Sequence, residues 1–392
     1  MAIEILACRS RAPGGGVRGG LGPRRDVAFA TNVARGRPDD VPSADVTTEA
    51  PSTGLPTVDA ACFLCDNTDT APVWTTPDRT FGVPGIFHVV RCRRCGFLYM
   101  RPRPQDDHLA DCYPDEYPRH QEPPVRTPFR GSPRRLEAVR YALSRYFGYA
   151  AYRDERVPLR TRLRGRRLVR RLRWDCPPWV GQGRYLDVGC GSGWALSVAQ
   201  ALGWRVAGIE VDAPAAEKAR RFTDDIHVGS VLTAPFPPGR FDLITTFHVL
   251  EHVTDPLAML RRMLEWLAPG GLLVIEVPNV GGLGARLFGA DWYALDLPRH
   301  LSHFTPKSLA DAVQRAGGRV VWCWHRSKPR DFIRSWRHWL RDRSWHRVAA
   351  ATERRLVYGV LKLLLELVLP LVRATGYGEV IRIGVVHERP RP

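Results

Sequence analysis

A short apolar run that leads directly into three glycines at alternate positions is the feature that most constrains this fold. The run is Tyr185–Val188, and a helical spacing of apolar residues begins at Trp194. The glycines between them are Gly189, Gly191 and Gly193. Glycines at a strand-to-helix turn permit a tight bend and let a ligand lie against bare backbone, next to the unpaired N–H groups of the helix. The segment therefore predicts a strand, a cofactor-binding loop and a helix; a generic tight turn in an α/β domain is the alternative.

The residues around this loop indicate which kind of cofactor it would hold. A second predicted strand, 205–209, ends at Glu210. An acidic residue about twenty positions after the glycine turn suits the two hydroxyls of a ribose. The glycine spacing G-x-G-x-G differs from the G-x-G-x-x-G of dinucleotide-binding loops. Asp187 precedes the first glycine by two residues. Negative charge at this place favours a cofactor with an amino group and a sulfonium over one with a pyrophosphate.

Strand and helix patterns alternate through the rest of this region. Short apolar strands are expected at 241–246, 272–277, 319–324 and 379–386, with a helix opened by Asp255-Pro256 and a group of helices at 328–375. Such alternation predicts a parallel, doubly wound sheet with its site at the carboxyl ends of the strands.

These segments resemble class I S-adenosylmethionine-dependent methyltransferases. The resemblance rests on LDVGCGSGWAL, VAGIEVD, PFPPGRFDLITTFHVLEHVTDP, LAPGGLLVIEVPN and PRHLSHFTPKSL, which span about 181–325 in the expected order. It implies an α/β fold with a Rossmann-like, doubly wound, seven-stranded methyltransferase sheet, and S-adenosyl-L-methionine as the cofactor.

The resemblance also assigns roles to single residues. The methionine part of the cofactor would be lined by Asp187, Gly189, Gly191 and Gly193. Glu210 would hold the ribose, and His248 would lie beside the cofactor. Many such enzymes have an acidic residue near the adenine amino group, and here Ser230 stands at that position.

Two C-x-x-C pairs lie upstream, Cys62/Cys65 and Cys92/Cys95. Four thiolates in two such pairs suit tetrahedral zinc, and disulfides are the alternative. No apolar signal segment opens the chain, and nine cysteines is an odd number. We therefore predict a structural zinc ion at these four residues. The remaining cysteines are interpreted as ordinary thiols: Cys8, Cys112, Cys176, Cys190 and Cys323.

The stretch CRRCGFLYMRPRPQDDHLADCYPDEY extends the resemblance to a subgroup with an N-terminal zinc-binding domain, which includes sugar C-methyltransferases and enzymes of glycan or natural-product pathways. The predicted organisation is a disordered basic tail (1–58), a zinc-knuckle domain (59–118), an Arg-rich helical linker (119–180), the methyltransferase core (181–327), an apolar and basic helical insertion (328–378), and a final strand with a tail (379–392).

Charge and hydropathy do not decide whether the protein contacts a membrane, a nucleic acid or another copy of itself. The net charge is +18, and ten arginines lie between 153 and 173. This segment is a solvated face, a contact for anionic lipid or, less favoured, a contact for nucleic acid. The apolar run 356–372 is shorter than the about 20 residues that a spanning helix needs. It is either buried against the core or a dimer partner, or docked on a membrane surface.

The catalytic base is expected among three histidines. His303 is the first choice, followed by His300 and His248, because histidine titrates near neutrality. The pattern H-x-x-E-H from His248 to His252 also occurs in zinc peptidases, but a peptidase needs it on a long helix, and here it follows a strand.

The predicted function is methyl transfer from S-adenosylmethionine to oxygen or carbon of a small molecule, a sugar or a glycan intermediate. The alternatives are an RNA methyltransferase and a non-catalytic, zinc-dependent binding module. We expect a cytoplasmic protein, with peripheral attachment to the inner face of the membrane and homodimer formation as open questions.

Overall fold

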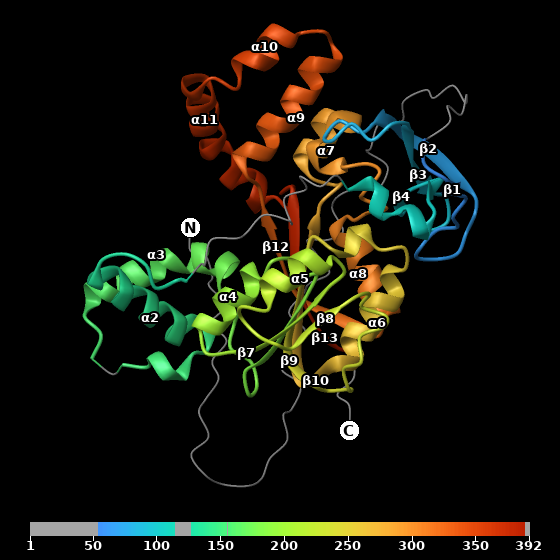
Figure 1. Ribbon diagram of the computed structural model, residues 1–392. Coiled ribbons are helices and arrows are strands. Elements are labelled where there is room, and N and C mark those ends of the chain that lie inside the picture. The colour runs from blue at the N-terminus through green and yellow to red at the C-terminus, as the bar shows by residue number, and fades with distance from the viewer. Residues whose placement is uncertain (1–53, 114–126, 155, 389–392) are drawn as a thin grey trace. The chain divides into compact units, whose positions relative to one another are not determined.

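The computed structural model of the protein describes residues 54–113, 127–154 and 156–388 (Figure 1). The chain divides into two compact units. The described parts of the smaller unit are 128–154 and 156–179, and the larger unit holds 54–113, Thr127 and 180–388. Most of the predicted basic tail, including Cys8, lies outside the described residues, as do 114–118 of the predicted zinc domain and 119–126 of the predicted linker.

A seven-stranded sheet forms the centre of the larger unit and confirms the predicted fold class. Its strand order is β12-β13-β10-β9-β6-β7-β8. Strands β8, β7, β6, β9 and β10 run parallel, and β13 is antiparallel to both of its neighbours. The strands are β6 (Arg184–Val188), β7 (Arg205–Glu210), β8 (Ile226–Val228), β9 (Phe241–Phe247), β10 (Leu267–Pro278), β12 (Gly318–Arg326) and β13 (Val380–His387).

Helices begin where the sequence supplies capping residues. The Asp212 carboxylate accepts from the backbone N–H of Ala215, and the Asp255 carboxylate accepts from that of Ala258. A proline follows each cap, in the position where its missing N–H costs nothing. The helices that alternate with the strands are α4 (Trp194–Ala201), α5 (Ala213–Ala219), α6 (Pro256–Trp266) and α8 (Pro306–Arg315).

Strand β10 begins earlier than the predicted 272–277. Leu267 already pairs with Phe241, and the register then shifts before Leu272 pairs with Leu243. Gly270, with φ +74°, lies between these two pairs. The intervening residues bulge out of the ladder because the glycine adopts a left-handed backbone. The sequence pattern Pro-Gly-Gly therefore marks a bulge inside the strand, after α6 has already ended at Trp266.

A second sheet lies next to the cysteine pairs: Cys92 ends one of its strands, and Cys62, Cys65 and Cys95 lie outside its strands. It has the order β11-β4-β3-β2, from β2 (Thr70–Pro77), β3 (Ile86–Cys92), β4 (Leu98–Met100) and β11 (Ser302–His303). A two-stranded sheet of β1 (Thr57–Val58) and β5 (Arg103–Pro104) accompanies it. Strand β11 comes from the segment between the core strands β10 and β12, so the region predicted as a separate domain at 59–118 shares a sheet with the core.

The smaller unit is a helical hairpin of α2 (Pro133–Phe147) and α3 (Leu159–Asp175). The helices approach closely at Gly165, where a Cβ atom would lie 2.6 Å from the ring of Tyr141 and 2.9 Å from the Ala138 carbonyl oxygen. The opposite face of α3 is exposed and carries Arg160, Arg162, Arg164, Arg166, Arg167, Arg170 and Arg171.

Three helices are inserted between β12 and β13, as predicted. They are α9 (Pro329–Asp342), α10 (His346–Ala351) and α11 (Arg355–Ala374), and Figure 1 shows them as one group at one end of the sheet. Helix α11 packs on α9 through Leu369 and Val372, which form a small core with Phe332. Across the residues that the structure covers, no helix is both long enough and apolar enough to cross a membrane.

Candidate functional site

The glycine loop connects β6 to α4 and is tied to β7. The backbone N–H groups of Gly189 and Cys190 both donate to the Ile209 carbonyl oxygen, at 2.8 and 3.0 Å. All three glycines have positive φ: +74° at Gly189, +53° at Gly191 and +91° at Gly193. These conformations explain why the sequence needs glycine at each alternate position.

The three glycines differ in how much space is available for a Cβ atom. A Cβ atom at Gly189 would lie 2.2 Å from a methyl carbon of Val249, and one at Gly193 would lie 2.6 Å from the ring of Phe222. A Cβ atom at Gly191 would meet nothing within 4 Å. The outer glycines therefore permit close packing, whereas Gly191 presents bare backbone to open space, as a loop that cradles a ligand would.

Glu210 lies against this loop at the end of β7. Its carboxylate accepts from the Gly191 N–H at 2.7 Å and from the Asp212 N–H at 3.0 Å, and the residue is only 5% exposed. Ser230 follows the neighbouring strand β8 and is exposed. Its hydroxyl oxygen accepts from the Leu232 N–H at 3.2 Å, which forms a local turn. Both predicted residues lie at the carboxyl edge of the sheet.

Asp187 is the last link of a buried hydrogen-bond chain. The Thr245 hydroxyl donates to the Asp187 carboxylate at 2.6 Å, and the Tyr185 hydroxyl lies 2.6 Å from the same Thr245 oxygen. Burial raises the pKa of Asp187 to about 7, although the Thr245 hydrogen bond opposes this rise. A cationic ligand at the loop would favour the ionised form of Asp187. The residues present thus fit a cofactor that carries positive charge.

His248 follows β9 and is held between two carboxylates. Its backbone is left-handed, with φ +58°, which is rare for a residue other than glycine. Its Nδ1 lies 3.3 Å from Glu251 and its Nε2 lies 3.2 Å from Glu276. Partial desolvation would lower the pKa of His248, whose side chain is 40% exposed, but the bonds to these carboxylates raise it to about 10. The ring is therefore an imidazolium, which donates protons rather than accepting them.

His252 and His300 form a pair beside Glu251. Their rings meet edge to face with centroids 4.6 Å apart. The Nδ1 atom of His252 lies 3.1 Å from the Arg299 carbonyl oxygen and 2.9 Å from the Tyr113 hydroxyl. The Nδ1 atom of His300 lies 2.9 Å from the Ala294 carbonyl oxygen. Because a carbonyl only accepts, both Nδ1 atoms carry a proton.

The surroundings keep the His252 ring neutral. Burial, followed by the nearby His300, lowers the pKa of His252 to about 4. Glu251, His252 and His300 each place one ligand-type atom within 4.8 Å of the others. Such a group exchanges protons with a substrate or accepts a cation. The sequence contained a signal for it in the H-x-x-E-H pattern, which includes both Glu251 and His252.

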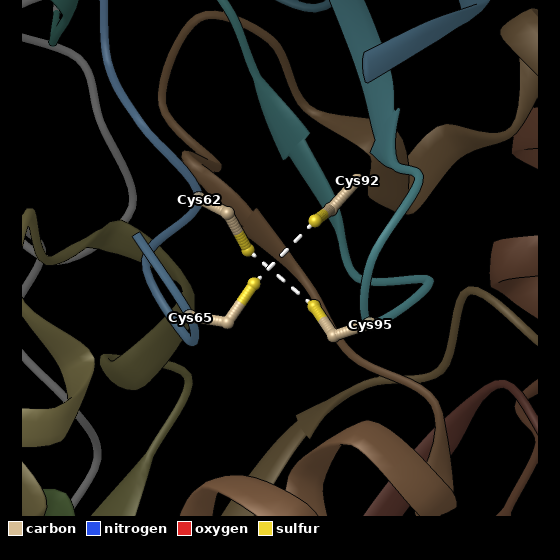
Figure 2. A group of neighbouring side chains, drawn as sticks. All are labelled: Cys62, Cys65, Cys92 and Cys95. Carbon is tan, nitrogen blue, oxygen red and sulfur yellow. Dashed lines mark hydrogen bonds between the residues drawn. The ribbon is translucent and has the colours of Figure 1, made fainter. Parts of the chain in front are cut away.

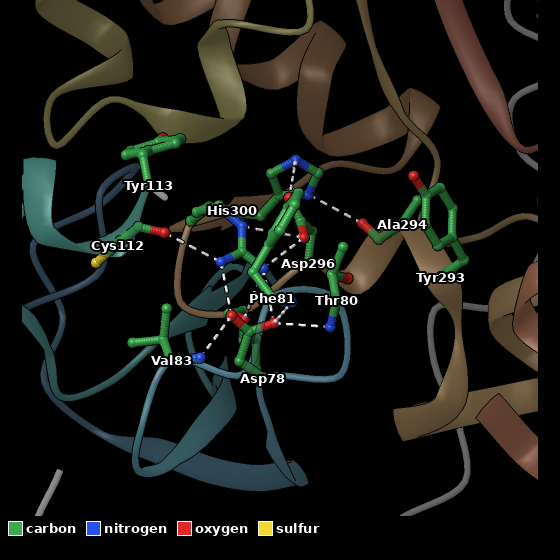
Figure 3. A network of polar contacts seen from close by, with 12 residues as sticks. Asp78, Thr80, Phe81, Val83, Cys112, Tyr113, Tyr293, Ala294, Asp296 and His300 are labelled. Atoms are coloured by element: carbon green, nitrogen blue, oxygen red, sulfur yellow. Dashed lines mark hydrogen bonds and ion pairs between the residues drawn. The ribbon is translucent and has the colours of Figure 1, made fainter. Parts of the chain in front are cut away.

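The buried side chain of Arg299 joins this cluster to the N-terminal segment. Figure 3 shows its partners Asp78, Cys112 and Asp296. Arg299 donates two hydrogen bonds to Asp78, at 2.7 and 2.8 Å, and two to Asp296, at 2.8 and 3.1 Å. It also donates to the Cys112 carbonyl oxygen at 3.1 Å. Tyr113, the next residue, is the one that contacts His252. Asp78 and Tyr113 could not be assigned to the site from the sequence, because their contacts span distant segments.

His303, the first choice for a catalytic base, lies on β11 and is 4% exposed. Its Nε2 atom is buried and has no hydrogen-bond partner among the described residues. Burial, followed by the nearby His300, lowers its pKa to about 3. Of the three predicted bases, His300 therefore belongs to the histidine pair, His248 is a neighbouring cation, and His303 is enclosed in the second sheet.

The two C-x-x-C pairs converge as predicted (Figure 2). The Sγ atoms of Cys62 and Cys95 are 3.5 Å apart, as are those of Cys65 and Cys92, and all four lie within 4.8 Å of one another. Zinc–thiolate bonds of about 2.3 Å in a tetrahedron separate the sulfur atoms by about 3.8 Å. The eight cysteines in the described ranges are all free thiols. The set fits a closed, four-thiolate zinc site.

Comparison with known proteins identifies the region around the glycine loop. Residues 149–321 match a family model described as "Methyltransferase domain". A ubiquinone biosynthesis O-methyltransferase of Xanthomonas campestris is 36% identical over 147 residues, which are 34% of this chain and 61% of the relative. A protein of the same name from Cereibacter sphaeroides is 31% identical over 146 residues, 34% of this chain and 59% of the relative. The chain thus spans about three fifths of the curated relatives it matches.

Among solved structures, an S-adenosylmethionine-dependent methyltransferase of Mesorhizobium loti is 19% identical, with a TM-score of 0.37 over 56% of this chain and 96% of that chain. A SAM-dependent methyltransferase of Archaeoglobus fulgidus is 19% identical, with a TM-score of 0.39 over 56% and 93%. The family match and the order of the strands and glycine loop agree. Residues 149–321 are therefore similar to methyltransferase domains.

Proposed function

We propose that this protein transfers a methyl group from S-adenosylmethionine to a small organic acceptor. The observation that carries the proposal is the arrangement of Gly191 and Glu210. The Glu210 carboxylate already engages the loop backbone at 2.7 Å, next to a face of Gly191 that is open for at least 4 Å. Glu210 would hold the ribose hydroxyls, and the three glycines with Asp187 would surround the methionine part.

Methyl transfer requires an acceptor atom in line with the methyl carbon, and a group that removes its proton. The cofactor, when bound, supplies an electrophilic methyl group on a sulfonium. We assign the base to His252, because its ring is neutral, its Nε2 has a lone pair, and it is more exposed than His300 or His303. Tyr113 and the Arg299 carbonyl would fix the ring. His248 would contribute a fixed positive charge beside the cofactor.

The proposal also concerns which class of molecule accepts the methyl group. The curated relatives are named as O-methyltransferases, which favours a hydroxyl group on a small molecule. The resemblance to enzymes with an N-terminal zinc-binding domain keeps sugars and glycan intermediates, methylated at oxygen or carbon, within the set to be tested.

We also propose that Cys62, Cys65, Cys92 and Cys95 bind one structural zinc ion. The support is the spacing of the four sulfur atoms and their free thiol state. Four thiolates fill the coordination sphere, so no position is left for a substrate. The ion would stabilise the turns that precede β2 and follow β3.

An RNA acceptor is the second candidate, and a specific observation favours it. Seven arginines are exposed on one helix, α3, in the smaller unit. A surface of this kind neutralises phosphates. RNA would then be methylated in a reaction whose rate falls steeply with salt, whereas the methylation of a small, uncharged acceptor would be insensitive to salt.

Calorimetric titration of the purified, zinc-loaded protein with S-adenosylmethionine, with NAD as the control, tests the central claim. Binding of the former alone supports the proposal, and a search for acceptors among hydroxylated small molecules, sugars and bulk RNA follows. Absence of binding to the folded protein would contradict it and favour a non-catalytic, zinc-dependent binding module.

A further inference from the structure

Helix α11 presents a continuous apolar face to solvent. Seven of its apolar side chains are at least half exposed, and they recur at intervals of three or four residues, so they lie on one face. This outward face of α11 consists of Leu356 (80% exposed), Val360 (51%), Leu363 (62%), Leu364 (55%), Leu367 (71%), Val368 (57%) and Leu371 (64%). A patch of this extent is a signature of an interaction surface.

The packing of α11 explains why this face is left uncovered. Only Leu369 and Val372 of this helix are buried, and they contact α9. Lys362 and Glu366 occupy a separate polar stripe, where they form an ion pair at 3.8 Å. The helix is thus held by one edge. Its widest apolar surface points away from the core of the larger unit.

Charge around the outward face is strongly positive. Between 334 and 374 there are nine Lys or Arg side chains and three carboxylates. Each carboxylate is already paired: Asp342 with Arg79, Glu353 with Arg341, and Glu366 with Lys362. The basic side chains therefore outnumber the acids that neutralise them. The helix itself starts directly after Arg354 and carries Arg373 at its end.

The neighbouring helices add aromatic side chains of the interfacial kind. Trp345, which precedes α10, is 55% exposed, and Val348 is 45% exposed. The guanidinium of Arg343 lies 4.1 Å from the ring centre of Trp339. Exposed tryptophan and leucine combined with arginine are typical of helices that lie in the plane of a membrane interface rather than crossing it.

From these observations we infer that the outward face of α11 docks on an anionic lipid bilayer. Apolar side chains enter the acyl boundary while the surrounding arginines contact lipid phosphates. A second copy of the chain suits this face less well. Symmetric pairing of two α11 helices would bring together their arginine-bearing ends, with no unpaired carboxylate among the described residues of this segment to compensate. The inference concerns attachment and does not depend on the methyl acceptor.

The test is co-sedimentation of the full chain with vesicles of phosphatidylcholine alone, and of phosphatidylcholine mixed with phosphatidylglycerol. The disruptive variant is L363E/L367E, which places charge at two side chains that touch little protein. The matched control is K362Q/E366Q, which alters the polar stripe of the same helix at 52% and 54% exposure without changing the net charge. Thermal unfolding and cofactor binding verify that both variants are folded.

We expect the native chain and K362Q/E366Q to bind the anionic vesicles and to release them at high salt. For L363E/L367E we expect a ~10-fold or greater loss of binding. Failure of the native chain to bind anionic vesicles would overturn the inference, as would equal binding to both vesicle types. A dimer in light scattering without lipid that L363E/L367E converts to a monomer would also overturn it, and would assign this face to self-association.

Discussion

Asp78 and Arg299 form a two-point ion pair although they lie 221 residues apart in the chain. Both side chains are fully buried, and the two N–O distances are 2.7 and 2.8 Å. Arg299 is also the residue whose carbonyl oxygen orients His252. The pair therefore connects the loop after β2 to the histidine cluster, so that the N-terminal sheet contributes directly to the shape of the candidate site.

Loss of this pair is expected to destabilise the fold strongly. Asp78→Ala leaves the Arg299 guanidinium buried without its main partner, so the free energy of unfolding should fall by about 3–5 kcal/mol. Asp311→Ala is the control, because it removes a surface pair with Lys307 and should cost under about 1 kcal/mol. Urea unfolding measures both. Equal losses in the two variants would contradict a structural role for the buried pair.

Cofactor affinity should depend on Glu210 far more than on Ser230. Glu210→Ala removes a carboxylate that would accept from the ribose, and hydrogen bonds to charged groups contribute about 1.5–3 kcal/mol, so the dissociation constant should rise ~10- to 100-fold. Ser230→Ala should change it less than ~3-fold, because the hydroxyl is already used in a local turn. A larger effect of Ser230→Ala in calorimetry would assign adenine recognition to the serine.

Affinity for S-adenosylmethionine should rise with pH through about 7, the pKa to which burial brings Asp187. Below this pH the folded protein holds the carboxyl neutral, so a cationic cofactor loses an attraction; above it the carboxylate is available. Thr245→Val removes the hydroxyl that donates to Asp187, so the midpoint should move to higher pH. In Asp187→Asn the dependence should vanish. An unchanged midpoint in Thr245→Val would contradict this account.

Removal of zinc should impair turnover more than cofactor binding. Cys62, Cys65, Cys92 and Cys95 order the sheet that includes β4 and β11, whereas the glycine loop and Glu210 belong to β6 and β7. A chelator or Cys92→Ser should therefore lower the melting temperature by ~5 °C or more and reduce methyl transfer, with cofactor affinity nearly unchanged. Metal analysis should find one zinc ion per chain. A fully stable and active protein without metal would refute the zinc site.

Two matched substitutions separate the candidate bases. His252→Asn should lower turnover by ~100-fold with little change in cofactor affinity, because it removes the proton acceptor. Tyr113→Phe should have a smaller effect of the same kind, since it only loosens the ring. His303→Asn should retain most of the turnover, given that this side chain is enclosed. If His303→Asn proved the more damaging substitution in the folded protein, His303 and not His252 would be the base.

Local patterns were sufficient to predict the central sheet and the cofactor loop. Some features depend only on consecutive residues and can therefore be recognised in the sequence. They are the glycines with positive φ, the acidic residue at the end of β7, and the helices that begin with a proline. The insertion between β12 and β13 was predicted because its apolar and basic composition differs from that of the strands around it.

The features that the sequence did not predict depend on contacts between distant segments of the chain. Tyr113 reaches His252 across 139 positions, and β11 is only two residues long, too short for any periodicity. The exposed state of α11 was also left open, since an apolar run has the same pattern whether its leucines meet a core or solvent. Distance in the chain, rather than unusual chemistry, separates what the sequence predicted from what it did not.

The pairing of β11 with β4 has a consequence for how this protein can be taken apart. Ser302 pairs with Tyr99 and His303 with Leu98, so two residues of the C-terminal region complete a sheet that begins in the cysteine-rich N-terminal region. A chimera that exchanged the first half for that of a related enzyme would separate this strand from its native neighbour. The sequences of the cysteine-rich N-terminal region and of the region that contains β11 are thus constrained to change together in evolution. The N-terminal region therefore cannot be exchanged as an independent domain.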